Sequence, residues 1–124
     1  MIEVERVDFV SIPTQNIDRA KEFYGVTLGL AENGPDEFDA GNVTVSLVFP
    51  DRIGRPMQNT PFGAIAIRVP DVEQARAKLE AAGVAFEGDT FDTGVCHMAF
   101  FQDPDGNGLM LHRRYAPFAD GTTP

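Results

Sequence analysis

Two stretches of this 124-residue chain repeat one pattern of strand, capping residue and amphipathic helix. Placing Phe9 over Ala64, an offset of 55 residues (64 − 9), also aligns Asn16 with Asp71. Few aligned residues are identical, but both copies have an apolar run, a helix-capping residue and then apolar residues at helical spacing. A duplicated βαβββ unit explains the repetition. A plain α+β sandwich of the ferredoxin-like type is the alternative, and the repeated cap favours duplication.

The first copy is predicted to begin with a strand over residues 7–12 and a helix over 17–24. Asn33-Gly34-Pro35 predicts a turn, Phe38 a short strand, and the alternation over 42–49 a half-buried strand. Residues 50–61 hold three prolines, which indicates a linker or a mobile loop.

The second copy is predicted to have a strand over 64–69, a helix over 72–82 and a short strand over 84–86. Strands over 95–101 and 108–113 follow, joined by a tight turn at Asp103-Pro104-Asp105-Gly106-Asn107. In that turn proline fixes φ, Asp and Asn bond their own backbone, and glycine accepts a positive φ. Residues 116–124 are expected to be frayed.

Net charge and cysteine content indicate which binding partners and which cellular compartment to expect. The net charge of −9 disfavours binding to a phosphate backbone, so no nucleic-acid partner is expected. The single cysteine, Cys96, cannot form a disulfide within the chain, which indicates a reducing compartment and a cytoplasmic protein. We expect no signal peptide and no membrane partner, because no stretch approaches the roughly 20 apolar residues that a spanning helix needs.

Two groups of motifs resemble those of one known family. The first is the opening Val7-Asp8-Phe9-Val10-Ser11-Ile12-Pro13, followed by Asn16-Ile17, Phe23-Tyr24 and Leu28-Gly29-Leu30. The second is Phe101-Gln102 with the Asp103–Asn107 turn. They are similar to the first module, and to the hairpin before the last strand, of the vicinal oxygen chelate (glyoxalase/bleomycin resistance/extradiol dioxygenase) superfamily. The resemblance covers about residues 4–115.

The resemblance implies an α+β fold in which two βαβββ modules form a cupped mixed β-sheet with helices outside. It implies one domain over 1–124, with modules at about 4–50 and 62–115 joined by the proline-rich linker. Family enzymes hold a divalent metal inside the cup through His and Glu from four strands. The resemblance also implies a homodimer.

At the four positions that align with the family's metal ligands, this chain has Phe9, Ser46, Ala64 and Met110. The side chains of Phe and Ala offer no lone pair, the sulfur of Met is a soft ligand, and a single Ser hydroxyl is a weak one. The divalent cations of the family need carboxylate oxygens or imidazole nitrogens. Among the neighbours only Asp8 could bind metal, and strand alternation directs it to the other face. We therefore expect no metal and no cofactor.

Strand alternation predicts which side chains line the cavity instead. It places Phe62 and Ala66 with Ala64, and Gly108 and His112 with Met110, while the resemblance turns Cys96, Met98 and Phe100 inward. The predicted ligand-binding residues are Phe9, Ser11, Thr44, Ser46, Ala64, Cys96, Met98, Phe100, Met110 and His112. An apolar pocket with a few polar groups suits a flat or aromatic small molecule. The apolar members could instead fill the cup as core.

The polar candidates each have two interpretations. His112 is either a histidine at the rim of the cavity or a ligand contact and general acid/base. Cys96 is either a small buried apolar residue or a nucleophile, and the second needs a nearby base. His97 should alternate out of the pocket and pack under a helix.

Four functions follow from this pattern. The favoured one is a metal-independent protein that binds an aromatic or antibiotic-like ligand. The second is a metal-free enzyme in which His112 performs acid/base chemistry. A metal-dependent lyase or dioxygenase is disfavoured by the four substitutions, and the last possibility is a scaffold whose cup is filled by its own side chains.

Overall fold

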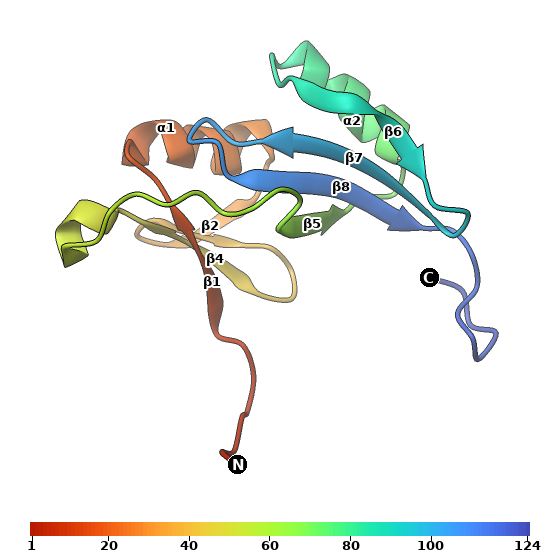
Figure 1. Ribbon diagram of the computed structural model, residues 1–124, viewed down its shortest axis with the longest axis horizontal. Helices are drawn as coiled ribbons and strands as arrows, with labels where there is room; N and C mark the ends of the chain where they lie inside the picture. The colour runs from red at the N-terminus through yellow and green to blue at the C-terminus, as the bar shows by residue number, and fades with distance from the viewer. The chain divides into compact units, whose positions relative to one another are not determined.

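The computed structural model describes residues 1–124, which form two compact units, unit 1 at Met1–Asn59 and unit 2 at Thr60–Pro124. Each unit contains one helix and one four-stranded mixed sheet, and the strand orders, β1-β4-β3-β2 and β5-β8-β7-β6, are equivalent (Figure 1). In both, the first strand pairs in parallel with the last, and the other pairs are antiparallel. The predicted α+β fold of two βαβββ modules is confirmed.

Unit 1 comprises β1 (Phe9–Pro13), α1 (Ile17–Glu22), β2 (Ala31–Gly34), β3 (Glu37–Asp39) and β4 (Thr44–Val48). Asn16 caps α1 by accepting a hydrogen bond from the amide of Arg19 at 3.0 Å. The core consists of side chains from the helix and from one face of the sheet: Ile12, Ala20, Phe23, Tyr24, Phe38, Val45 and Leu47.

The predicted helix over 17–24 differs from the observed one at its end. After Glu22 the chain continues as a π-helix, η1 (Phe23–Thr27), in which the amide of Leu28 donates to the carbonyl of Phe23 at 2.8 Å. This wider turn lets both Phe23 and Tyr24 reach the core. Gly25 is required there, since a Cβ atom would lie 3.1 Å from the ring of Phe38.

Unit 2 comprises β5 (Ile65–Arg68), α2 (Val72–Ala81), β6 (Phe86–Asp92), β7 (Cys96–Gln102) and β8 (Gly108–Arg114). Asp71 caps α2 as Asn16 caps α1, by accepting from the amide of Gln74 at 2.9 Å, so the cap recurs at the predicted offset. α2 packs on β6, β7 and β8 (Figure 1). The buried apolar residues are Val72, Leu79, Cys96, Ala99, Phe101, Leu109 and Leu111.

The turn between β7 and β8 forms as its residues predict. Asp103 Oδ1 accepts hydrogen bonds from the amides of Asp105 and Asn107, both at 2.9 Å, and Gly106 has a φ of 87°. Asn107 Nδ2 donates to Asp103 Oδ2 at 2.8 Å. Both side chains are buried, so the turn is a rigid end for the hairpin.

Four local predictions were wrong. Residues 31–34 form β2, so the predicted turn moves to Pro35 and Asp36. The strand predicted at 84–86 lies at 86–92. Residues 50–53 of the predicted linker form a 3₁₀ helix, η2 (Pro50–Ile53).

The fourth error concerns residues 116–124, which fold back as a turn instead of fraying. Arg114 Nη2 donates to the carbonyl of Pro117 at 2.7 Å, and its guanidinium lies 4.7 Å from the centroid of the Phe118 ring. The amide of Phe118 donates to the carbonyl of Thr122 at 2.8 Å. Neither helix is long and apolar enough to cross a lipid bilayer.

Candidate functional site

The sheet of unit 2 turns one face toward α2, and its other face, here called the helix-free face, carries many of the predicted ligand-binding residues. Register pairs Met98 with His112 and Phe100 with Met110, and Ala66 pairs with Met110 from the other side. Paired residues share a face, whereas the intervening Ala99 and Leu111 are buried on the side of α2. The helix-free face of unit 2 is thus Ala66, Arg68, Met98, Phe100, Met110 and His112, with Ala64 just before β5 and Cys96 at the start of β7.

This face is largely apolar and only partly covered. Met98, Phe100, Met110 and His112 are half-buried, and Ala64 and Ala66 are exposed. Cys96 is buried and unpaired, in agreement with a small apolar role. The arrangement provides methyl, thioether and aromatic groups for an apolar ligand.

Phe62 joins this surface from the loop before β5. Its ring stacks on Phe100 with centroids 4.5 Å apart and an interplanar angle of 24°, and 66% of Phe62 is exposed. The predicted alternation assumed a strand through this position, but β5 begins only at Ile65. Strand alternation predicted that Phe62 lies on this face, but Phe62 reaches the face from a loop and not as part of a strand.

His112 is a polar group on the helix-free face of unit 2, and its register partners are Arg68 on β5 and Met98 on β7. The face therefore carries an imidazole next to an exposed guanidinium. The imidazole of His112 forms no hydrogen bond or ion pair within the protein, so both ring nitrogens are available to a ligand. A general base is normally oriented by a further side chain, and His112 has none.

The helix-free face of unit 1 is more polar. Phe9 pairs with Thr44 and Ser11 with Ser46, which places these four predicted residues on one face. The face also carries Glu37 and Asp39, because these pair with Ser46 and Thr44 across β3 and β4. Asp39 Oδ1 accepts from the amide of Gly41 at 2.7 Å.

The two carboxylates were missed from the sequence, although a signal for them exists. Phe38 is buried against Tyr24 and Gly25 of η1, so its neighbours Glu37 and Asp39 must point to the opposite face. Glu37 and Asp39 give the helix-free face of unit 1 a negative character.

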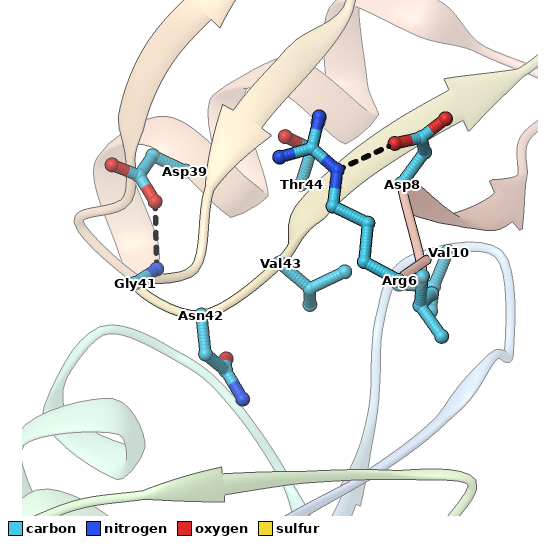
Figure 2. Close-up of a pocket in the computed structure, with 9 residues that line it drawn as sticks. Arg6, Asp8, Val10, Asp39, Gly41, Asn42, Val43 and Thr44 are labelled. Atoms are coloured by element: carbon cyan, nitrogen blue, oxygen red, sulfur yellow. Dashed lines mark hydrogen bonds and ion pairs between the residues drawn. The ribbon is translucent and has the colours of Figure 1, made fainter. Parts of the chain in front are cut away.

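A pocket of about 560 Å³ opens beside this face, where residues 6–10 lie next to the β3–β4 connection (Figure 2). Arg6 Nε donates to Asp8 Oδ1 at 2.9 Å within it. Of the predicted ligand-binding residues only Thr44 lines the pocket. Its walls are Arg6, Val7, Asp8, Val10, Asp39, Gly41, Asn42, Val43 and Thr44.

The four positions tested for a metal do not carry a set of donors that fits a divalent cation. In unit 1, Phe9 presents a half-exposed ring beside Thr44, and Ser46 presents one hydroxyl. In unit 2, Ala64 presents a methyl group, and Met110 lies against Phe100. No group of three or more His, Cys, Asp or Glu side chains is placed to bind a metal. A hard cation would find too few oxygen or nitrogen ligands at these positions.

His97 lies on the side of α2, as alternation predicts, but it is not packed beneath the helix. Its side chain is 44% exposed, with Nε2 3.5 Å from Asp92 Oδ2 and the ring 4.8 Å from that of Tyr115. It helps to line a shallow pocket of about 410 Å³ with Glu73 and Arg76 of α2.

Asp92 and Tyr115 link the β6–β7 hairpin to the segment after β8. The hydroxyl of Tyr115 donates to Asp92 Oδ1 at 2.8 Å. The amide of Gly94 and this hydroxyl lower the pKa of Asp92. The same hydrogen bond to the carboxylate raises the pKa of Tyr115.

Comparison with known proteins agrees with this architecture. Antibiotic binding protein TnmS3 from Streptomyces sp. CB03234 is 25% identical, with a TM-score of 0.73 over 92% of this chain and 99% of that chain. A superfamily member from Sphaerobacter thermophilus is 21% identical, with a TM-score of 0.74 over 88% of this chain and 97% of that chain. The second likeness concerns the fold alone.

Among characterised sequences, a lactoylglutathione lyase from Pseudomonas putida is 44% identical over 45 residues. That stretch is 36% of this chain and only 26% of the lyase, so the match spans about a quarter of that protein. Residues 6–111 match the profile described as Glyoxalase/Bleomycin resistance protein/Dioxygenase superfamily. This match covers most of the chain, which therefore belongs to the Glyoxalase/Bleomycin resistance protein/Dioxygenase superfamily.

Proposed function

We propose that this chain is a metal-independent binding protein for a flat or aromatic small molecule. The observation that carries the proposal is the helix-free face of unit 2, where Met98, Phe100 and Met110 lie on one side of His112 and Arg68 lies on the other. Apolar groups supply most of the contact area in such sites, and one or two polar groups orient the ligand.

Two further points support binding rather than metal chemistry. The donor set at Phe9, Ser46, Ala64 and Met110 does not suit a divalent cation. The likeness to TnmS3, an antibiotic binding protein, extends over almost the full length of both chains. His112 then serves as a hydrogen-bonding contact, because no neighbouring side chain fixes its tautomer for proton transfer.

The experiment is a thermal-stability titration with acridine, a flat tricyclic aromatic compound, and with its saturated counterpart perhydroacridine. The ring nitrogen of the perhydroacridine is acetylated in every experiment, so that both compounds are uncharged at neutral pH. A ligand that binds only the folded state stabilises it by about 2.7 kcal/mol at a hundredfold excess over Kd. Met110→Lys places a charge on the helix-free face and should abolish the shift. Gln74→Lys adds the same charge on exposed α2 and should preserve it.

Three results would contradict the proposal. If acridine causes no shift in melting temperature, the protein does not bind a ligand of the proposed class. A stoichiometric divalent metal in the purified protein would contradict metal independence. Turnover of a bound compound that His112→Ala abolishes would make the protein an enzyme.

We also propose that the two units are modules of a single domain and that the chain works as a cytoplasmic homodimer. Family membership supports the assembly, and the single cysteine suits a reducing compartment. Sedimentation equilibrium tests the dimer, since a mass of one chain at micromolar concentration would contradict it.

A further inference from the structure

We propose that Phe62 is the stacking contact for the ligand, which carries a planar aromatic ring that lies on the face of Phe62 not covered by Phe100. This inference rests on the proposed function and adds the residue and the ligand chemistry. Phe62 belongs to the loop before β5, outside the family motifs and outside the sheet.

The first argument is the geometry of the two rings. Phe100 covers one side of the Phe62 ring in an almost parallel stack at 4.5 Å. Two-thirds of Phe62 nevertheless remains exposed, so the stack leaves much of the ring open to a ligand. A second flat ring can continue the stack, and aromatic pairs prefer such offset arrangements at centroid separations of roughly 4.5–7 Å.

The second argument is that the backbone around Phe62 is held in place before any ligand arrives. The amide of Thr60 donates to Asn107 Oδ1 at 2.9 Å, and the amide of Gly108 donates to the carbonyl of Thr60 at 3.3 Å. The amide of Ala64 closes the loop by donating to the carbonyl of Pro61 at 3.1 Å. The rigid turn at Asp103–Asn107 thus anchors residues 60–63 to the hairpin.

Gly63 completes this anchoring by allowing the loop to lie directly on the sheet. Its φ of 62° is in the left-handed region, and a Cβ there would lie 3.1 Å from Met110 Cε and 3.2 Å from Phe100 Cε1. Only glycine permits both the backbone angle and the close approach. Phe62 therefore meets a ligand with little loss of conformational freedom, which favours binding.

The experiment compares Kd values for acridine and perhydroacridine by calorimetry, using Phe62→Ala, Phe62→Leu and Phe62→Trp. Phe118→Ala is the matched control, because Phe118 is an exposed phenylalanine of unit 2 that packs on Arg114 instead of on the sheet. We expect Phe62→Ala to raise the Kd for acridine about five- to tenfold, as the loss of one aromatic pair implies. Phe62→Trp should preserve or improve binding, and Phe118→Ala should leave it within about twofold.

Phe62→Leu keeps apolar bulk without a ring, so it should abolish the preference for acridine over perhydroacridine. The chain has no tryptophan, so Phe62→Trp also provides a unique fluorophore whose emission should be quenched by stacked acridine. If the wild type binds acridine and Phe62→Ala binds it equally or more tightly, Phe62 is not the contact, although the proposed function stands. If neither the wild type nor any variant binds acridine, the inference and the aromatic ligand of the proposed function are both overturned.

Discussion

Replacing Gly108 with alanine tests the packing of residues 60–63 on β8. A Cβ atom on Gly108 would point directly onto the carbonyl oxygen of Pro61 and lie 2.8 Å from its carbonyl carbon and 2.9 Å from the amide nitrogen of Gly63. These neighbours are backbone atoms, so no side-chain rotation can relieve the clash. The loop must therefore move away from the sheet.

The cost follows from the contacts that move with the loop. The hydrogen bonds from Thr60 to Asn107 and from Gly108 to Thr60 contribute about 0.5–1.5 kcal/mol each. The stack of Phe62 on Phe100 contributes about 0.5–1.5 kcal/mol more. We expect Gly108→Ala to lower the free energy of unfolding by about 2–4 kcal/mol, or the melting temperature by about 8–16 °C.

Thermal and urea unfolding measure the loss, and hydrogen exchange at the Thr60 amide shows whether the loop has left the hairpin. Gly34→Ala is the control, because its Cβ would meet only the movable side chain of Glu37, at 3.2 Å. A melting temperature for Gly108→Ala within 2 °C of the control, with the Thr60 amide still protected, would refute the packing described here.

Four other predictions concern single residues. Asn16→Ala and Asp71→Ala should each destabilise by about 1 kcal/mol in urea unfolding, because each removes an equivalent helix cap. Thr60→Val should be neutral or stabilise by about 1 kcal/mol, since it removes a buried hydroxyl that has no partner, and a loss above 1 kcal/mol would contradict this. Phe101→Ala should cost about 3–5 kcal/mol, because that ring is 1% exposed. The pKa of Asp92 is lowered in the folded protein, so the ionised carboxylate stabilises the fold above the unfolded pKa of about 3.9, and this stabilisation is lost as pH falls through the folded pKa. The pKa of Tyr115 is raised, so the protonated hydroxyl stabilises the fold below about pH 10, and this stabilisation is lost as pH rises through the folded pKa. The stability difference between wild type and Tyr115→Phe should therefore be largest between these limits, and a difference independent of pH would contradict the shared hydrogen bond.

The sequence predicts those parts of the fold that depend on neighbouring residues. The caps at Asn16 and Asp71 and the turn from Asp103 to Asn107 are local, because each side chain bonds to backbone only a few residues away. The burial of Phe38 and Phe101 follows from strand alternation in the same way.

Strands whose formation depends on pairing with another strand are not predicted from neighbouring residues in this way. β2 has little apolar alternation and contains Gly34, so only its pairing with β3 makes it a strand. β6 contains Gly88 with a φ of 71°, and an irregularity in register between Glu87 and Phe91 absorbs it while β7 supplies the hydrogen bonds. In both cases the partner strand compensates for a weak intrinsic preference.

The same distinction applies to the candidate site. Alternation places Met110 and His112 correctly on one face, because both lie within a regular strand. It cannot describe Phe62, whose position depends on a proline, a left-handed glycine and a hydrogen bond from Thr60 to a turn 47 residues away. The conformation of an irregular loop depends on the surface on which it packs, and the sequence of such a loop has no periodic pattern from which that conformation could be predicted.

The proposed function rests on the side chains that the helix-free face of unit 2 presents. At the positions that align with the family's metal ligands, Ala64 and Met110 offer a methyl group and a thioether, which are poor ligands for a hard cation. Beside them, the exposed ring of Phe62 stacks on Phe100 and offers aromatic surface. His112 and Arg68 pair across β8 and β5 and are polar side chains of the same face. In the proposed binding function, the apolar groups supply most of the contact area, and His112 and Arg68 orient the ligand.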